Sequence, residues 1–163
     1  MLVKLSTDIY RYTSVSVEKS KEDINRMLKK FRINEKRWTE AGPEQSFVEF
    51  IIRKTDELAF LIKITVPYIE EGKRGRKSYY DEKRSYRILF HYLKSLLTAK
   101  EAEISTIEEI FMPHIVTTAD GRTLGDQMKV AIEKGNQPAL EGFSVVGIKE
   151  KNKVLRVIKT EET

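Results

Sequence analysis

Two stretches of the chain alternate apolar and polar residues with the period of a β-strand. Every second residue in them is large and apolar: Val48, Phe50 and Ile52 in the first, and Phe60, Ile62, Ile64 and Val66 in the second. The polar run 53–57 separates them and Pro67 follows, so the pattern predicts an antiparallel hairpin that ends at Pro67. Residues 9–17, rich in Tyr, Thr, Val and Ser, and residues 35–40 predict two further strands.

A first helical stretch repeats its apolar residues with a period close to 3.6. Ile24, Met27, Leu28 and Phe31 fall on one face of this segment. Ser20 precedes them and is the residue type that most often caps a helix N-terminus. The pattern therefore predicts a helix from Ser20 to Phe31.

The longest predicted helix runs from Asp81 to Glu103. Its apolar stripe consists of Tyr86, Leu89, Phe90, Leu93, Leu96 and Leu97. Lys83, Arg87, His91 and Lys94 form a second, basic stripe beside it. This second stripe is interpreted either as an ordinary exposed helix edge or as part of a binding surface.

Weaker signals follow the long helix. Residues 105–108 form a capping-box pattern that predicts a short helix through Phe111. Residues 116–123 predict an extended segment around an Asp-Gly turn. A further helix is expected over 124–134, and Gly135 is expected to end it.

The C-terminal part begins with the linker-like sequence 135–138, and the segments 145–148 and 154–158 could pair as a hairpin. The expected fold is α+β: an antiparallel sheet packed by two main helices, with a short helix and a possible C-terminal hairpin. Residues 1–135 are expected to form a single domain, and 136–163 a linker with a hairpin or tail.

The amino-acid composition excludes several classes of functional site. Thirty Lys and Arg against 25 Asp and Glu give a net charge of +5 and a pI near 9.3. The chain has no Cys and only two His, so disulfides and Cys-based zinc sites are excluded, and no metal or cofactor is expected. No apolar run approaches the roughly 18 residues of a membrane span, and no signal peptide is recognised. A cytoplasmic protein with no membrane partner is therefore expected.

The strongest functional signal is a basic run, which lies between the predicted hairpin and the longest helix. It contains Lys73, Arg74, Arg76 and Lys77, with Tyr79 and Tyr80 directly after it. Basic loops commonly bind anions, and proteins that hold single-stranded nucleic acid add aromatic rings on which bases stack. We expect these residues, together with Lys83, Arg87 and Lys94, to bind nucleic acid or another partner. Tyr10, Tyr12 and Trp38 could add stacking surfaces.

The clearest catalytic candidates are His114 and Asp120, with Glu108 and Glu109 before them. Such groups could serve general-base or metal chemistry. Their spacing matches no motif that this chemistry requires, however, and both glutamates fit the first turn of a helix. We therefore favour a structural role for His114 and Asp120, and a protein that is not an enzyme.

Several segments of the chain resemble a known group of proteins, which suggests a biological context. The segments that carry it are 84–97, 108–116 and the Asp-Gly-Arg-Thr element 120–123, together with the Val-Glu-Phe strand 48–50. Over roughly residues 10–135 the chain resembles a group of small uncharacterised proteins carried by phages and prophages. The resemblance implies a viral or mobile-element setting and no particular activity.

These observations lead to one function with two alternatives. The first is a phage-type accessory protein that binds nucleic acid, plausibly single-stranded, without catalysis. The second is a protein-binding inhibitor or modulator of a host enzyme or host defence system, since the same basic patch would attract an acidic host protein. The third is a metal-dependent nuclease or phosphodiesterase, which would need carboxylates gathered around His114. The sequence leaves the target and the oligomeric state open.

Overall fold

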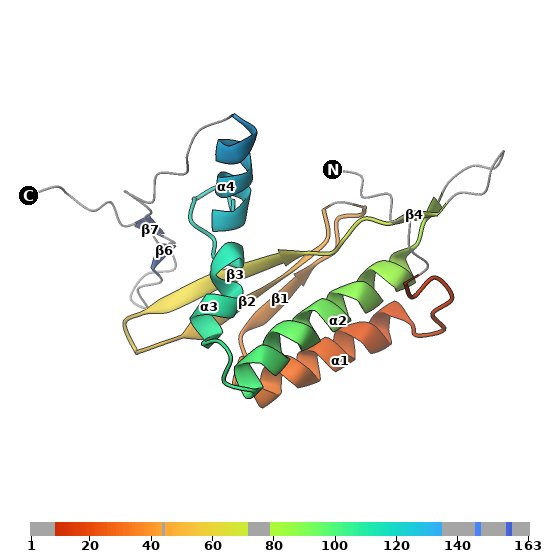
Figure 1. The fold of residues 1–163 in the computed structure, drawn as a ribbon, viewed down its shortest axis with the longest axis horizontal. Coiled ribbons are helices and arrows are strands. Elements are labelled where there is room, and N and C mark those ends of the chain that lie inside the picture. Colours follow the sequence, from red (N-terminus) through yellow and green to blue (C-terminus); the bar gives the residue numbers. More distant parts are fainter. Residues whose placement is uncertain (1–8, 44, 72–78, 135–145, 148–155, 158–163) are drawn as a thin grey trace, which may run out of the picture.

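The computed structural model describes residues 9–43, 45–71, 79–134, 146–147 and 156–157 (Figure 1). In chain order the elements are α1 (Val17–Lys30), β1 (Lys36–Thr39), β2 (Phe47–Arg53), β3 (Ala59–Thr65), β4 (Glu70–Glu71), β5 (Tyr79–Tyr80), α2 (Glu82–Glu101), α3 (Ile107–Phe111), the 3-10 turn η1 (Met112–His114), α4 (Leu124–Glu133), β6 (Val146–Gly147) and β7 (Arg156–Val157). A three-stranded antiparallel sheet and four α-helices confirm the α+β fold among the described residues.

The central sheet has the strand order β1-β2-β3, and each neighbouring pair is antiparallel. The apolar residues that predicted the hairpin stand opposite one another: Val48 with Ile64, Phe50 with Ile62, and Ile52 with Phe60. Directly opposed residues point to the same face of a sheet. The predicted hairpin is therefore confirmed, and it gives the sheet one continuous apolar face.

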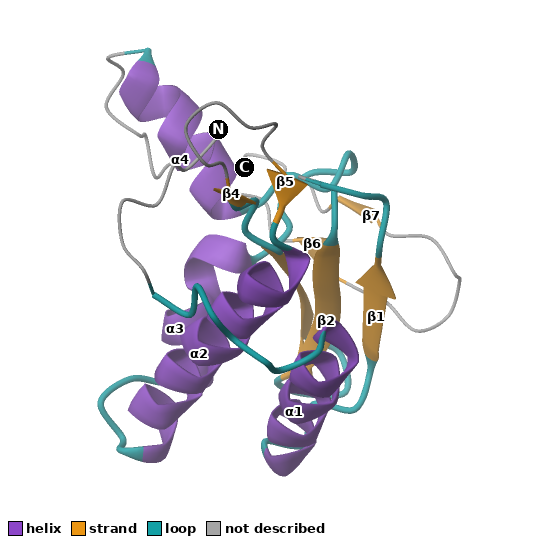
Figure 2. Cartoon of the chain, turned by 90° about the vertical axis from the view of Figure 1, so that its right-hand side faces the viewer, coloured by secondary structure: helices purple, strands orange, loops and turns teal. Residues whose placement is uncertain are grey.

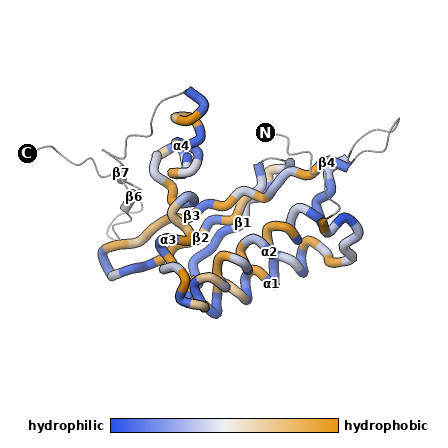
Figure 3. Tube along the Cα trace, viewed as in Figure 1, coloured by the Kyte–Doolittle hydropathy of each residue, from blue (hydrophilic) through white to orange (hydrophobic). Residues whose placement is uncertain are grey.

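Helices α1 and α2 lie side by side on that apolar face (Figures 1 and 2). Apolar and polar residues alternate along both helices (Figure 3). Ile24 and Leu28 of α1 are fully buried, and they share one core with Leu89, Leu93 and Leu97 of α2. The helical stripes found in the sequence thus define the core, and Asp81 caps α2 by accepting a hydrogen bond from Arg84 N at 3.1 Å.

The start of the chain differs from the sequence-based expectation. Residues 9–16 form turns and irregular structure rather than a strand, and Tyr10 has a positive φ of 56°. Strand propensity is realised only where a partner edge is present, and this segment instead contacts α2, whose Arg84 bonds the Ile9 carbonyl. Helix α1 also begins earlier than predicted. Its N-cap is Ser16, whereas Ser20 is fully buried within the helix.

Most of the weaker signals are confirmed with small shifts. The capping box of α3 joins Thr106 and Glu109, one residue later than predicted. Val116 and Thr123 pair across the Asp-Gly turn, where Gly121 has a φ of +82°. Helix α4 begins at Leu124 as predicted and ends at Glu133, with Lys134 as its C-cap; Gly135, predicted to end it, lies outside the described residues. Strands β6 and β7 pair antiparallel, which confirms the hairpin pairing, while the expected linker 135–138 lies outside the described residues.

The sequence predicts no membrane-spanning segment, and this prediction can be compared with the length and polarity of the helices. Helix α2 is the longest, but its 20 residues include many charged ones. Within the part of the chain that the structure describes, no helix combines the length and the apolar character needed to cross a bilayer.

Candidate functional site

The basic run that dominated the sequence connects β4 to β5. Its residues Lys73, Arg74, Arg76 and Lys77 lie outside the described residues. The strands on either side of the run pair antiparallel, with Glu70 opposite Tyr80 and Glu71 opposite Tyr79. The basic residues therefore belong to the connection between the two strands of a short antiparallel ribbon.

Aromatic rings surround the base of this ribbon. The side chain of Tyr79 is 62% exposed, whereas Tyr80 is half-buried and stacks on Tyr68, with ring centroids 5.3 Å apart. Tyr12 is 88% exposed, and the Arg11 guanidinium lies 5.7 Å from the centre of its ring. Tyr79 and Tyr12 thus expose two flat apolar faces to solvent.

An ion-pair network centred on the buried Arg84 ties together the segments that carry these rings. The Arg84 side chain is only 4% exposed, donates to Glu71 at 2.6 Å and donates to the Ile9 carbonyl at 2.8 Å. Arg11 lies 3.2 Å from the same Glu71 carboxylate. The network joins the N-terminal segment, β4 and α2. Sequence reasoning missed Arg84, because no local pattern distinguishes a buried arginine on a helix from an exposed one.

The predicted basic stripe of α2 is divided between different environments. Arg87 lies 3.5 Å from Asp23 of α1, and its guanidinium stacks 4.3 Å from the centre of the Phe90 ring. Lys83 and Lys94 are exposed. The stripe therefore presents two separated lysines to solvent, with Arg87 held against α1 between them.

His91, the remaining residue of the basic stripe, and the stacking candidates Tyr10 and Trp38 also have partners within the fold. His91 stacks on Tyr10, with ring centroids 4.4 Å apart and planes inclined by 8°. Burial lowers the pKa of His91, and the nearby Arg87 and Lys94 lower it further. Trp38 packs against Tyr86 in the core and donates its indole N–H to Asn25 at 3.2 Å. Trp38 is therefore a packing residue rather than an exposed stacking platform.

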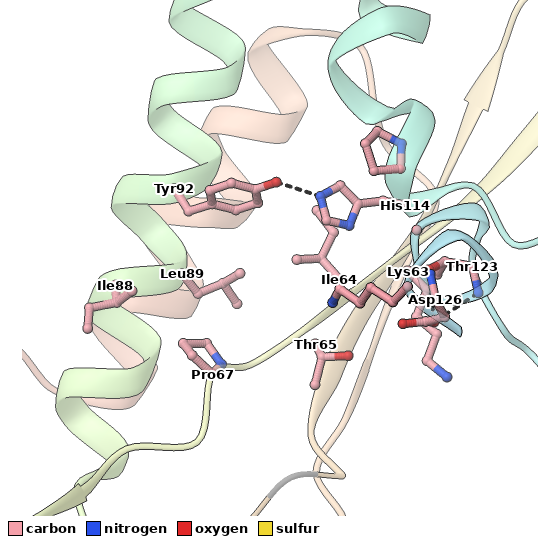
Figure 4. A pocket seen from close by; sticks show the side chains of 13 residues that line it. Lys63, Ile64, Thr65, Pro67, Ile88, Leu89, Tyr92, His114, Thr123 and Asp126 are labelled. Carbon is pink, nitrogen blue, oxygen red and sulfur yellow. Dashed lines mark hydrogen bonds between the residues drawn. The ribbon is translucent and has the colours of Figure 1, made fainter. Parts of the chain in front are cut away.

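A second feature is a cavity of about 440 Å³ between α2, the end of β3, η1 and the start of α4 (Figure 4). Its lining residues are Lys63, Ile64, Thr65, Pro67, Ile88, Leu89, Tyr92, Pro113, His114, Thr123, Gly125, Asp126 and Lys129. Cavities of a few hundred Å³ with an apolar wall and several polar groups are typical of small-molecule sites. Sequence reasoning missed this one because its residues come from four separate segments.

His114 points toward Tyr92 in this cavity, and the phenol oxygen lies 2.6 Å from Nε2 (Figure 4). Burial lowers the pKa of His114 most strongly; Asp126 opposes this shift, and Lys129 adds to it. Burial also raises the pKa of Tyr92. Both side chains are therefore uncharged near neutral pH.

The cavity also contains charged groups at the first turn of α4. The Asp126 carboxylate accepts hydrogen bonds from Thr123 N at 3.0 Å and Thr123 Oγ1 at 2.8 Å. Burial raises the pKa of Asp126, but these hydrogen bonds and the ammonium groups of Lys129 and Lys63 outweigh it, so the pKa is lowered. Lys63 and Lys129 therefore both act on one carboxylate beside His114.

The acidic residues considered for catalysis lie elsewhere. Asp120 is exposed, pairs with Arg122 at 2.8 Å and does not line the cavity. Glu108 pairs with Lys54, and Glu109 caps α3. Among the residues with described positions, no group of three or more His, Asp or Glu side chains could hold a metal ion. The structure brings His114 together with Asp126 instead.

The chain was also compared with known proteins. No family model matches the chain, and none of the curated proteins or solved structures compared with it gives a significant match.

Proposed function

We propose that the protein binds single-stranded nucleic acid at the N-terminal end of α2, without catalysing a reaction. The observation that carries the proposal is that exposed Tyr12, Tyr79 and Lys83 each neighbour a member of the Arg11–Glu71–Arg84 ion-pair network, along the chain or across the ribbon. Glu71 stands opposite Tyr79 in the ribbon and pairs with both Arg11 and Arg84. Tyr12 and Lys83 are the chain neighbours of those two arginines.

This arrangement combines the two elements that single-strand binding requires. Exposed aromatic rings can stack on bases, and basic side chains can neutralise phosphates. The connection between β4 and β5 contributes four basic residues close in sequence to Tyr79. A phage-type accessory role in the cytoplasm belongs to the same proposal and rests on the family resemblance.

Fluorescence anisotropy with a labelled single-stranded oligonucleotide tests this function. Three or four phosphate contacts should give a log–log salt slope of about −2 to −3. Tyr79→Ala and Tyr12→Ala should each weaken binding by about 1–3 kcal/mol, the usual loss when a stacking ring is removed. Binding that is absent at low salt, or that is insensitive to salt, would contradict the proposal.

A charge-matched pair of variants separates a local site from general attraction. Arg74→Gln with Arg76→Gln and Arg26→Gln with Lys29→Gln remove the same net charge. Arg26 and Lys29 are exposed on α1. Only the first variant should weaken binding and flatten the salt slope. Equal losses in both variants would mean that the excess positive charge attracts the oligonucleotide without a defined site.

A further inference from the structure

The cavity beside His114 has one wall that is fixed by close backbone packing. Gly125, in the first turn of α4, lies so near η1 that a Cβ atom placed on it would be 2.8 Å from the Pro113 carbonyl oxygen. The Leu124 N–H also donates to the Ile115 carbonyl at 2.9 Å. The start of α4 is thereby held against η1, and the polar groups of both elements face the same space.

The opposite wall of the cavity is apolar. It consists of Ile64 and Pro67 at the end of β3 and of Ile88 and Leu89 on α2 (Figure 4). Ile64 is 3% exposed and Leu89 is 1% exposed, so both belong to the core, and the accessible part of this wall is formed by the half-buried Pro67 and Ile88. A ligand that covers this wall would remove further apolar surface from water, which is favourable in proportion to the area covered.

The polar wall carries a net positive charge. Lys63 and Lys129 are balanced by one carboxylate, that of Asp126, and its oxygens already accept the hydrogen bonds that cap α4. His114 is neutral, and its Nε2 is engaged with the Tyr92 hydroxyl. If Tyr92 donates that bond, the imidazole proton lies on Nδ1, which can donate to a ligand.

We propose that this cavity binds a small organic anion that has an apolar body. The body lies against Pro67 and Ile88, and the anionic group faces Lys63 and Lys129 with a hydrogen bond from His114. Charge-assisted hydrogen bonds to ammonium groups are strong enough to select such a ligand over its uncharged analogue. This site is separate from the surface proposed for nucleic acid.

Two fluorescent probes that share one aromatic body test the proposal. 8-Anilinonaphthalene-1-sulfonate carries a sulfonate, and N-phenyl-1-naphthylamine lacks it. Titration of the folded full-length chain should give a Kd for the sulfonate about tenfold below that of the neutral probe. Thr65→Phe, which places a ring in the cavity from an exposed strand position, should weaken the binding of both probes at least tenfold.

The charge contribution is tested separately. Lys63→Gln with Lys129→Gln should remove the preference for the sulfonate and leave the neutral probe unchanged, whereas the control Lys29→Gln with Lys134→Gln should change neither. Tyr79→Ala should also leave both titrations unchanged, which separates this site from the proposed function. The proposal is overturned by equal affinities for the two probes, by no binding up to about 1 mM, or by a folded Thr65→Phe variant that titrates like the wild type.

Discussion

Helices α2 and α4 are attached to the molecule in different ways, although the sequence predicts both. Helix α2 buries six of its 20 residues, Leu89, Leu93 and Leu97 among them. Helix α4 has no buried residue among its ten, and Ile132 is 64% exposed. The first helix is held along a face, and the second is held at one end.

Helix α2 contributes mainly to the stability of the core, whereas the held end of α4 contributes polar groups to the cavity. The contacts of α4 are concentrated at its first turn, where Thr123 and Asp126 form a capping box and Gly125 packs on η1. Elements with few buried apolar contacts open locally at a smaller free-energy cost than the core. The cavity lies where the two kinds of attachment meet, between α2, which is held along a face, and the end of α4 that is held against η1.

The largest expected effect tests the face of α2. Leu93→Ala should lower the free energy of unfolding by about 2–5 kcal/mol, because Leu93 is fully buried at the interface with α1 and the sheet. Lys94→Ala on the same helix and Ile132→Ala on α4 should each change it by less than about 0.5 kcal/mol. Denaturant melts of the three variants check this. Equal losses for Leu93→Ala and Ile132→Ala would show that α4 is packed as tightly as α2.

The next effect concerns the held end of α4. Gly125→Ala introduces a Cβ atom 2.8 Å from the Pro113 carbonyl oxygen, and the strain should exceed the gain in helix propensity. We expect a loss of about 1–2 kcal/mol in the free energy of local opening of α4, measured by hydrogen exchange. The midpoint of global unfolding should change little. A global loss as large as that of Leu93→Ala would mean that α4 unfolds together with the core.

The two helices can also be compared by replacing the N-cap residue of each with alanine. Asp81 caps α2 and Thr123 caps α4, each by accepting a hydrogen bond from a backbone N–H three residues later. Asp81→Ala and Thr123→Ala should each cost about 1 kcal/mol. The loss at α2 should appear in denaturant melts, and the loss at α4 in amide exchange of α4 alone. If both variants changed the denaturant melts and the amide exchange of α4 by the same amounts, α2 and α4 would not differ in how they are attached.

The smallest effect is a dependence on pH. Burial lowers the pKa values of His91 and His114, so the unfolded chain binds protons more readily than the folded one. Stability is therefore complete above the ordinary histidine pKa of about 6.5 and falls as the pH decreases below it. His114→Gln should reduce this acid sensitivity in the exchange rates of α4, whereas His91→Gln should reduce it in global melts. Melts that are flat between about pH 7 and 5 would contradict the expectation.

The sequence predicts those parts of the fold in which one element has its own repeating pattern. The β2–β3 hairpin and α2 are found because periods of 2 and 3.6 place Phe50 and Leu93 on a single buried face. Residues 9–17 have no such repeating pattern, and the strand predicted for them is not formed. Their composition favours a strand, but a strand needs a partner edge, and Arg84 instead ties this segment to α2.

The candidate sites were less accessible to sequence reasoning, since they depend on contacts between distant segments. Arg87 has the same local signature as Lys83, yet α1 brings Asp23 beside it and leaves Lys83 exposed. His114 was noticed for its chemistry, but its neighbours Tyr92 and Asp126 belong to other elements. The contacts of both α2 and α4 with η1 bring these groups together. The proposed nucleic-acid residues remain predictions.

The pairing of α1 with α2 also matters while the chain is being synthesised. Helix α1 ends at Lys30 and α2 begins at Glu82, so the 51 residues 31–81 are made between them. At a synthesis rate of about 5–20 residues per second, α2 is made roughly 3–10 s after α1, and until then it cannot cover the apolar face of α1. During this interval Ile24 and Leu28 are available to chaperones or to neighbouring nascent chains. Slower translation of the sheet would lengthen that exposure without changing the final fold.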